Sequence, residues 1–362
     1  MRNKLVAAAI AGLVAAPTMA NAAADVSWFG FNQITAGSTS ENASGDGGGI
    51  AFGVDRIRIG YKAKFDSGAH SKLQVDFNRG NPGNTRGGLQ APDIIKDAVV
   101  GYKFNSAADI QVGERKAPIG MDFNTSGKKL DIVNRGMEKD YVIERTAGAF
   151  LFGGVNNFGY AVFVGNPATR SGAVPSSGAG SIGGEDYSYG GRVSYDMGKM
   201  LHAELSYGTS TTSNTGAAAD DYSVTDIGLK SQPMPNLTLK AEYLSGSSVG
   251  LVDGRDQTVW YLHGGYEFTP MLEGVLRYYN STAETDGTFA GTGGEDSLTM
   301  SETYVGLNVF LNPEKHHEAR IQVNYIMPSG DTEYPGFHRT GTVTDDSGEA
   351  TGTWKAMFQT AF

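Results

Sequence analysis

Hydrophobic and polar residues alternate along much of this chain, in segments of about ten residues. Successive side chains of a β-strand point to opposite faces, so a period of two predicts strands with one apolar and one polar face. The segment 51–65 shows this pattern clearly. Its apolar face carries isoleucine and aromatic residues, and its polar face carries four basic residues, Arg56, Arg58, Lys62 and Lys64.

Further alternating segments follow in pairs. A tight turn at 66–69 joins the first segment to 72–78, which predicts a β-hairpin. The uncharged segment 146–166 predicts two strands, because glycine and asparagine at its centre mark a turn. Other hairpins are predicted at 98–104 with 110–115, 187–197 with 201–207, 222–230 with 237–243, 258–268 with 272–279, and 304–311 with 321–327.

The connections between these segments alternate between short turns and long loops rich in glycine, serine, threonine and aspartate. This alternation is typical of a transmembrane β-barrel. The last predicted strand, 353–362, ends the chain, with Trp354, Phe358 and Phe362 at even steps. A terminal aromatic residue on an alternating strand is typical of bacterial outer-membrane barrels. We expect about 16 strands in a closed antiparallel barrel.

The basic face of 51–65 fixes which side of the sheet meets water. A Lys or Arg facing lipid at mid-bilayer costs about 2 to 4 kcal/mol, so four of them on one face must line a wet lumen. Every backbone group in lipid needs a hydrogen-bond partner, so the sheet must close. The pattern therefore predicts an all-β, water-filled pore.

The first 22 residues predict a signal peptide that is removed. Arg2 and Lys4 precede an apolar run, 5–16, and small residues at 20–22 form a cleavage site. We expect residues 23–362 to form one barrel domain in the outer membrane of a Gram-negative bacterium. Beyond the leader, no segment has the length and helical period of a membrane helix. The chain contains no cysteine, which excludes disulfides and thiolate metal sites.

Charge is distributed unevenly along the chain. The formal net charge is -10, with Lys+Arg 29 against Asp+Glu 39. Residues 51–150 hold 16 basic and 12 acidic residues, a net +4, whereas 151–362 hold 11 and 24, a net -13. The basic residues therefore concentrate in the early strands and in one long loop.

That loop, at about 116–144, is too long for a simple connection between neighbouring strands. A long loop without regular structure is usually functional, and inside a barrel it would fold into the lumen. We expect it to form a constriction loop that narrows the channel. It carries Lys116, Lys128, Lys129, Arg135 and Lys139.

The residues around this loop carry a family resemblance. The run 113–121, followed by Thr125-Ser126, Asp131, Asn134-Arg135-Gly136, Arg145 and Gly148, resembles the phosphate-selective porin O and P family. The resemblance implies a 16-stranded trimeric barrel with an in-folded third loop and an anion path lined by Arg and Lys. Ile119 stands where Phe is common in the family, and Asn134 where Glu is common.

Fixed cations in a narrow lumen raise the local anion concentration, so the basic residues are the candidate pore-lining site. The candidates are Arg56, Arg58, Lys62, Lys64, Arg115, Lys116, Lys128, Lys129 and Arg135. The alternative is that they are wall residues paired with carboxylates, or that some attach the loop to the wall. The carboxylates available for such pairs are Asp55, Asp76, Asp97 and Glu114.

Other motifs carry weaker signals. Residues 178–183 match a dinucleotide fingerprint and 246–250 a nucleophile elbow, but neither precedes a helix. His316 and His317 lie in a short turn near acidic residues, and 345–349 and 295–296 form an acidic rim. These motifs are interpreted as solvated turns and loops, so we expect no catalytic site, metal ion or cofactor.

The sequence thus predicts an outer-membrane porin for passive diffusion of small hydrophilic solutes, with a preference for anions and phosphate as a candidate. The expected partners are small anionic solutes, outer-membrane lipid, lipopolysaccharide and two further copies in a homotrimer, with no nucleic acid. Three alternatives stay open: a general or cation-preferring porin, an outer-membrane enzyme, and a structural barrel with a plugged lumen.

Overall fold

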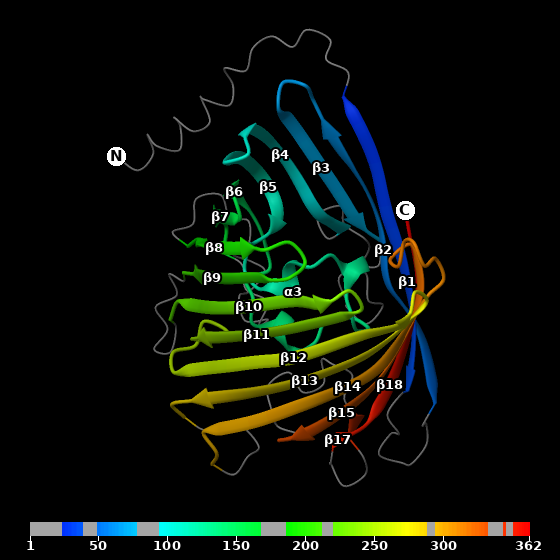
Figure 1. Ribbon diagram of the computed structural model, residues 1–362. Coiled ribbons are helices and arrows are strands. Elements are labelled where there is room, and N and C mark those ends of the chain that lie inside the picture. Colours follow the sequence, from blue (N-terminus) through cyan, green and yellow to red (C-terminus); the bar gives the residue numbers. More distant parts are fainter. Residues whose placement is uncertain are drawn as a thin grey trace.

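The computed structural model describes residues 24–38, 49–77, 94–167, 186–211, 220–287, 294–331, 343–344 and 350–362. Within these residues, sixteen antiparallel strands form one closed barrel (Figure 1), as predicted. The predicted signal peptide, 1–22, lies outside the described residues. No helix in the described part of the chain is long and apolar enough to cross a membrane.

The strands follow one another around the barrel in chain order. They are β1 (Asp25–Ser38), β2 (Ile50–Lys64), β3 (Ala69–Asp76), β4 (Ile95–Asn105), β5 (Ala108–Lys116), β6 (Arg145–Val155), β7 (Phe158–Gly165), β8 (Ser188–Asp196), β9 (His202–Ser210), β10 (Tyr222–Met234), β11 (Leu237–Ser247), β12 (Arg255–Thr269), β13 (Leu272–Thr285), β14 (Ser297–Phe310), β15 (Ala319–Gly330) and β18 (Thr353–Ala361). Two short strands, β16 (Val343–Thr344) and β17 (Ala350–Thr351), pair separately with each other.

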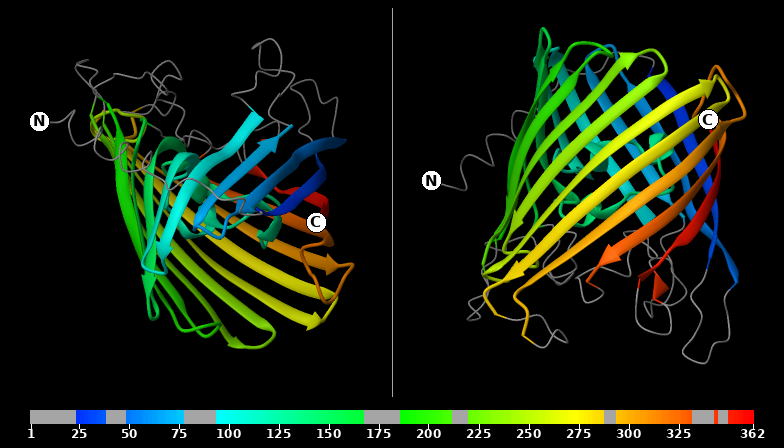
Figure 2. Two further views of the ribbon diagram at one scale, coloured as in Figure 1. Left: turned by 90° about the horizontal axis from the view of Figure 1, so that it is seen from above. Right: turned by 60° about the horizontal axis from the view of Figure 1, so that its bottom comes forward.

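The first and last strands close the barrel. β1 pairs with β2 on one side and with β18 on the other, where Phe31 lies opposite Ala361 and Gly37 opposite Lys355. Closure leaves the sheet without a free edge. Strands in lipid need this closure, because each backbone polar group there must have a hydrogen-bond partner. Figure 2 shows the strands tilted around the barrel.

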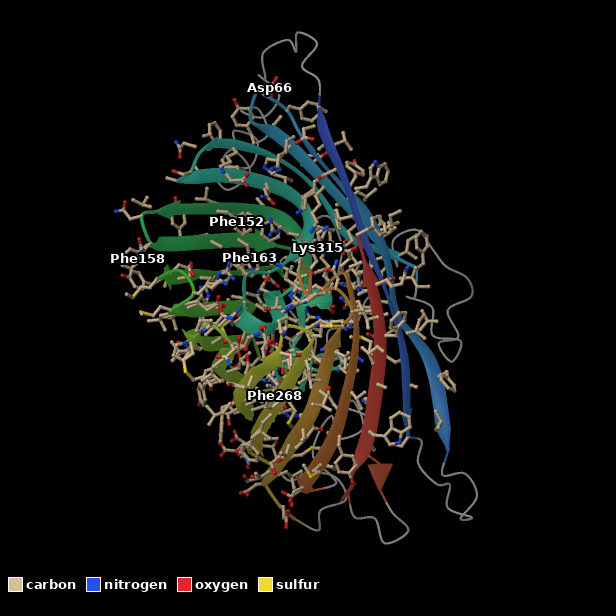
Figure 3. All side chains as sticks on the ribbon, turned by 45° about the vertical axis from the view of Figure 1, so that its right-hand side comes forward. Asp66, Phe152, Phe158, Phe163, Phe268 and Lys315 are labelled. Carbon is tan, nitrogen blue, oxygen red and sulfur yellow. The ribbon has the colours of Figure 1, made fainter. Side chains whose placement is uncertain are left out.

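The two faces of the strands differ as the alternation predicts. On β2, Ile57 and Ile59 are exposed on the outside, whereas Arg58 is half-buried on the inside. Phe158 and Phe268, labelled in Figure 3, are also exposed and contribute to the apolar outer surface. An apolar exterior around a largely polar interior is the arrangement of a transmembrane barrel.

One predicted turn differs from the structure. The predicted strands 222–230 and 237–243 leave 231–236 as their connection, but β10 continues to Met234. Its pairing with β11 shifts register between Ser231 and Met234. Pro233 lies in this shift, and because proline has no N–H to donate, it is tolerated where the ladder is interrupted.

The segment 117–144, between β5 and β6, contains α3 (Met121–Asn124) and two short 3-10 turns, η1 (Gly127–Lys129) and η2 (Met137–Asp140). It packs against an apolar patch on the inner faces of β6, β7 and β10 to β15. This patch includes Val259, Tyr261 and Tyr279, which are completely buried. The inner face is therefore not uniformly polar, and the apolar part of it lies under this segment.

Candidate functional site

Hydrogen bonds attach the segment 117–144 to three neighbouring strands of the barrel, β1, β18 and β15. Gln33 of β1 donates to the carbonyl of Gly127 at 3.0 Å, and Gln359 of β18 donates to that of Lys128 at 3.1 Å. Farther along, the N–H of Val133 donates to Asn324 of β15 at 2.6 Å. Because these wall residues point into the barrel, the segment lies against the inner wall.

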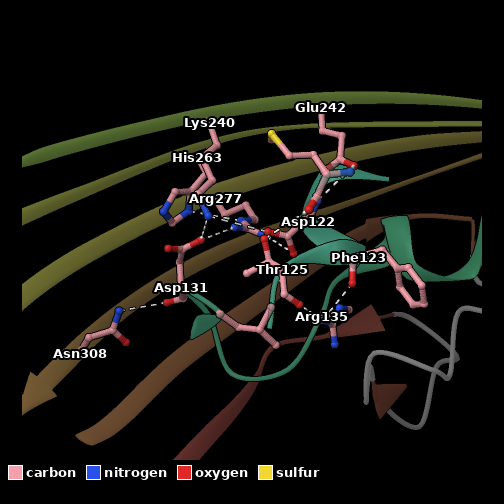
Figure 4. Close-up of polar contacts among 12 residues, drawn as sticks. Asp122, Phe123, Thr125, Asp131, Arg135, Lys240, Glu242, His263, Arg277 and Asn308 are labelled. Carbon is pink, nitrogen blue, oxygen red and sulfur yellow. Dashed lines mark hydrogen bonds and ion pairs between the residues drawn. The ribbon is translucent and has the colours of Figure 1, made fainter. Parts of the chain in front are cut away.

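Two carboxylates of the segment, the buried Asp122 and the half-buried Asp131, meet two cations of the wall (Figure 4). Asp131 Oδ2 lies 2.5 Å from Lys240 Nζ and 3.1 Å from Arg277 Nη2. Asp122 Oδ2 lies 3.5 Å from Arg277 Nη1. Burial opposes ionisation of Asp131, but the charges of Lys240, His263 and Arg277 outweigh it and lower its pKa. The segment is thus held by a desolvated charge network.

Glu242 of β11 holds the start of α3. Its carboxylate accepts the backbone N–H of Met121 at 2.7 Å and that of Asp122 at 3.1 Å. These are N–H groups of a helical turn that lack partners within the helix. Glu242 therefore fixes the position of the turn that carries Asp122.

Two of the candidate basic residues stabilise the segment from within. Lys116 and Arg135 both donate to the backbone carbonyls of Phe123 and Thr125. Both cations also lie over the ring of Phe123, at 4.5 and 5.4 Å from its centroid. Burial, followed by repulsion from Arg56, lowers the pKa of Arg135 to about 9. Attraction from Asp122 and Glu138 opposes this repulsion, so groups of both signs act on the guanidinium of Arg135.

A cavity of about 530 Å³ lies between the segment and the wall formed by β1 to β6. Of the described side chains that line it, eight are basic and one, Asp97, is acidic. Five of the basic residues belong to the wall: Arg58, Lys62, Lys72, Arg115 and Arg145. The other three, at the end of β5 and in the loop, are Lys116, Lys128 and Lys129.

Six of the nine candidate residues thus line one cavity, and the other three do not. Arg56 forms an ion pair with Asp55 at 2.6 Å and donates to Gln33, beside the segment. Arg135 lies within the segment, as described above. Lys64 is the exposed last residue of β2.

Sequence reasoning did not select two of the lining residues, Lys72 and Arg145. Lys72 lies directly opposite Lys62 in the β2–β3 hairpin, so the register of the predicted hairpin could have indicated it. Lys72 and Arg145 both form ion pairs with Asp97. Arg58 is paired with Asp76 at 2.8 Å. The pairing alternative therefore applies to Arg56 and Arg58.

The remaining lining cations lack such partners. Among the described carboxylates, none forms a salt bridge with Lys62, Arg115, Lys116, Lys128 or Lys129. Burial and the neighbouring ammonium groups of Lys129 and Lys62 lower the pKa of Lys128. Like charges held close together in a narrow space create a positive potential.

One difference from the family pattern has a structural reason. Asn134 has a φ of 67°, in the left-handed region. Asparagine is enriched several-fold among the non-glycine residues that adopt this conformation. The turn at this position therefore favours Asn over the Glu that is common there.

The weaker motifs have ordinary surroundings. Ser248 Oγ donates to Asp220 at 3.0 Å. His316 stacks on Phe310 with ring centroids 4.0 Å apart. Within the described ranges, no group of three or more His, Asp or Glu is arranged to hold a metal ion. The motifs at 178–183 and 345–349 lie outside the described residues.

A closed barrel of sixteen strands with an apolar exterior and a largely polar interior is a transmembrane β-barrel of the outer-membrane type. Solved structures of this class share the fold. An anion-selective porin from Comamonas acidovorans has a TM-score of 0.62 at 13% sequence identity, and the match covers 94% of this chain and 100% of that chain. The outer membrane channel DcaP of Acinetobacter baumannii has a TM-score of 0.62 at 13% sequence identity, and the match covers 96% of this chain and 100% of that chain. OmpF of Salmonella typhi, in complex with daunomycin, has a TM-score of 0.63 at 14% sequence identity, and the match covers 93% of this chain and 97% of that chain.

Residues 30–267 match the family model of phosphate-selective porin O and P, which is more than half of the chain. The chain belongs to this family. It is an outer-membrane channel of a Gram-negative bacterium and allows passive diffusion of small hydrophilic solutes. A search of curated protein sequences found no match.

Proposed function

We propose that this porin prefers anions and that the cavity between 117–144 and β1 to β6 is the selective part of its channel. The observation that carries the proposal is the charge of the cavity lining, with eight basic residues and one acidic residue among the described side chains. Inorganic phosphate is one candidate solute. The segment 117–144 acts as the constriction loop.

The local charge outweighs the acidic average of the chain. Exposed charges farther away than a Debye length, about 8 Å at physiological salt, are largely screened. The lining cations act on an ion at contact distance. Ion selectivity therefore depends on the lining residues rather than on the net charge of -10.

A cation-preferring pore is the second candidate, because a second cavity of about 400 Å³ on the other side of α3 contains carboxylates. Its acidic lining residues are Asp122, Asp196 and Glu204. They are accompanied by four basic residues, Arg192, Lys199, Lys230 and Lys240. This balance adds no negative excess to the path, so the anion preference is favoured.

The reversal potential across a planar bilayer under a KCl gradient distinguishes the two candidates. We expect the wild-type sign to correspond to chloride preference. Lys62→Gln and Arg115→Gln should each weaken it, because each removes a lining cation. The matched control is Lys315→Gln, since Lys315 is exposed in the turn before β15. A wild-type potential with the sign of potassium preference would reject the proposal.

Three further features belong to the proposal. Residues 1–22 are a removed signal peptide, which N-terminal sequencing of the mature protein would test. Three copies assemble into a homotrimer, which crosslinking in detergent would test. The outer surface contacts membrane lipid and the loops contact lipopolysaccharide, so lipopolysaccharide should remain bound during gentle extraction.

The chain is proposed to act as a channel without hydrolytic activity. Ser248, the nucleophile candidate, donates to the carboxylate of Asp220 at 3.0 Å. A serine of the triad type is activated by a histidine, whereas the described side-chain partners of Ser248 are the carboxylates of Asp220 and Asp256. Hydrolysis of lipid or peptide substrates that Ser248→Ala abolishes would contradict this part of the proposal.

A further inference from the structure

The cavity contains a feature that attraction of small inorganic anions does not require, the aromatic ring of Phe29. Phe29 of β1 lies opposite Gly60 of β2. A Cβ atom at Gly60 would lie 2.7 Å from Cζ of Phe29, so the ring occupies the space that a side chain at position 60 would fill. Phe29 is half-buried and lines the cavity. The absence of a side chain at Gly60 therefore lets the ring lie along the inner wall.

Two ammonium groups flank this ring. Nζ of Lys62 lies 5.5 Å from the ring centroid, and Nζ of Lys72 lies 5.8 Å from it. The two lysines are directly opposite each other in the β2–β3 hairpin. Lys72 is also bound to Asp97, whereas Lys62 is exposed and forms no salt bridge with a described carboxylate. One cation without a salt bridge to a described carboxylate thus lies over the aromatic surface.

Cations and aromatic rings recur together around the cavity. Arg58 lies 5.3 Å from the centroid of Phe31, the next inward residue of β1 after Phe29. A solute that offers only charge makes no use of an aromatic surface. Exposed apolar surface in water is unfavourable, and a flat apolar group of a solute would cover it while its charge meets a lysine.

We propose that this cavity is a subsite for planar organic anions, with aromatic carboxylates as the class. The ring of the anion stacks on Phe29, and its carboxylate binds Lys62 and Lys72. The volume of about 530 Å³ lies in the range of small-molecule sites, roughly 300 to 1,000 Å³. This inference rests on the proposed anion preference and adds the chemical class of the solute.

Block of the chloride current by added organic anions tests the inference. Wild-type channels in planar bilayers with equal KCl on both sides would receive acetate, benzoate or cyclohexanecarboxylate. We expect benzoate to reach half block at a concentration roughly three- to tenfold lower than acetate, because stacking adds to the attraction of charge. Cyclohexanecarboxylate has the same charge and a similar size but no flat ring, so it should block less than benzoate.

Substitutions then show which side chains produce the preference for benzoate over acetate. Phe29→Leu should bring the benzoate-to-acetate ratio close to one, whereas Phe29→Tyr, which keeps the ring, should retain it. Lys62→Gln should weaken block by both anions. The matched control is Phe52→Leu, since Phe52 is 79% exposed on the outside of β2 and should leave the ratio unchanged.

Several outcomes would overturn the inference. Equal block by acetate and benzoate in the wild type would do so without any variant, and so would equal block by cyclohexanecarboxylate and benzoate. An unchanged ratio in a folded Phe29→Leu barrel would also reject it. The reversal potential in KCl alone distinguishes failure of the proposed anion preference from failure of the proposed subsite. Potassium preference rejects the proposed function, whereas chloride preference without benzoate preference rejects only this subsite.

Discussion

Nη2 of Arg277 in β13 lies 3.1 Å from Oδ2 of Asp131, so a fully buried cation of the wall meets a carboxylate of the segment 117–144. The same guanidinium reaches Asp122 at 3.5 Å and donates to the hydroxyl of Tyr279 at 2.8 Å. Arg277 thus connects two points of the segment to one strand. Its planar fork, with donors in fixed directions, suits such a position better than the single ammonium of lysine.

Removal of this cation should destabilise the attachment of the segment. In Arg277→Met, the buried carboxylate of Asp122 and the half-buried carboxylate of Asp131 lose a partner. Breaking a buried ion pair typically costs about 3 to 5 kcal/mol. We expect a lower temperature for loss of the compact, heat-modifiable form on gels. We also expect a larger and noisier single-channel conductance, because the segment would leave the wall.

Lys315→Met is the matched control for this change. Lys315 is exposed in the turn before β15, and its salt bridge is with Glu318 of the same turn, away from the charge network. It should therefore leave both the transition temperature and the conductance near the wild-type values. If Arg277→Met behaves like this control, the charge network does not hold the segment.

A buried acid in the segment gives an expected dependence on pH. Burial, followed by repulsion from Asp122, raises the pKa of Glu138 from its ordinary value of 4.5 to about 7. Between these values the folded protein retains a proton that the unfolded chain has released. The free energy of unfolding therefore falls as the pH rises through this window, and the loss is complete above the folded pKa.

Glu138→Gln should remove this contribution, because glutamine stays neutral at every pH. We expect the variant to gain roughly 1 to 3 kcal/mol relative to the wild type between about pH 5 and about pH 8. The midpoint of thermal unfolding in detergent at each pH measures it. Glu314→Gln, at an exposed turn, is the control. A difference between Glu138→Gln and wild type that does not change with pH would refute the explanation.

The alternation of residues was sufficient to predict the barrel. In β2 the period of two separates Ile57 and Ile59 from Arg58, and the cost of a charge in lipid decides which face lies inside. The same reasoning applies to each hairpin, because neighbouring strands share a lipid-facing side. Local pattern and membrane energetics therefore determine the fold, and the turn at Pro233 differs only in its boundary.

The contacts inside the barrel could be predicted only in part. The density of basic residues indicated Lys62, Arg115 and Lys116, since they lie close to the long loop in sequence or on a basic face. Lys240 and Arg277 are isolated basic residues in an acidic half of the chain. Their role depends on which strands the segment 117–144 reaches, and that is a long-range relationship that no local pattern contains.

The apolar patch inside the barrel was not predicted for a related reason. Tyr261 and Tyr279 lie at inward positions of β12 and β13, with ring centroids 5.2 Å apart. Tyrosine suits either face of a membrane strand, because it has an apolar ring and a polar hydroxyl. The two rings become part of a buried core only because the segment 117–144 covers them.

The seam between the first and last strands gives a further expected outcome. Gly30 N donates to the carbonyl of Phe362 at 3.2 Å, and Phe362 N donates to the carbonyl of Gly30 at 3.0 Å. A Cβ atom at Gly30 would lie 2.6 Å from the Phe362 ring and 2.7 Å from the carbonyl oxygen of Arg58. The second contact is with backbone, so a side-chain movement cannot relieve it.

Gly30→Val should therefore weaken the closure of the barrel. Overpacking of this kind typically costs about 1 to 3 kcal/mol, and we expect a lower yield of heat-modifiable barrel after refolding into detergent. Gly287→Val is the matched control, since no described atom lies within 4 Å of a Cβ at that position. Phe362→Ala removes the ring but not the clash with Arg58, so it should restore only part of the yield in the double variant. Full yield from Gly30→Val alone would show that the seam tolerates a side chain and that close packing there is not needed for closure.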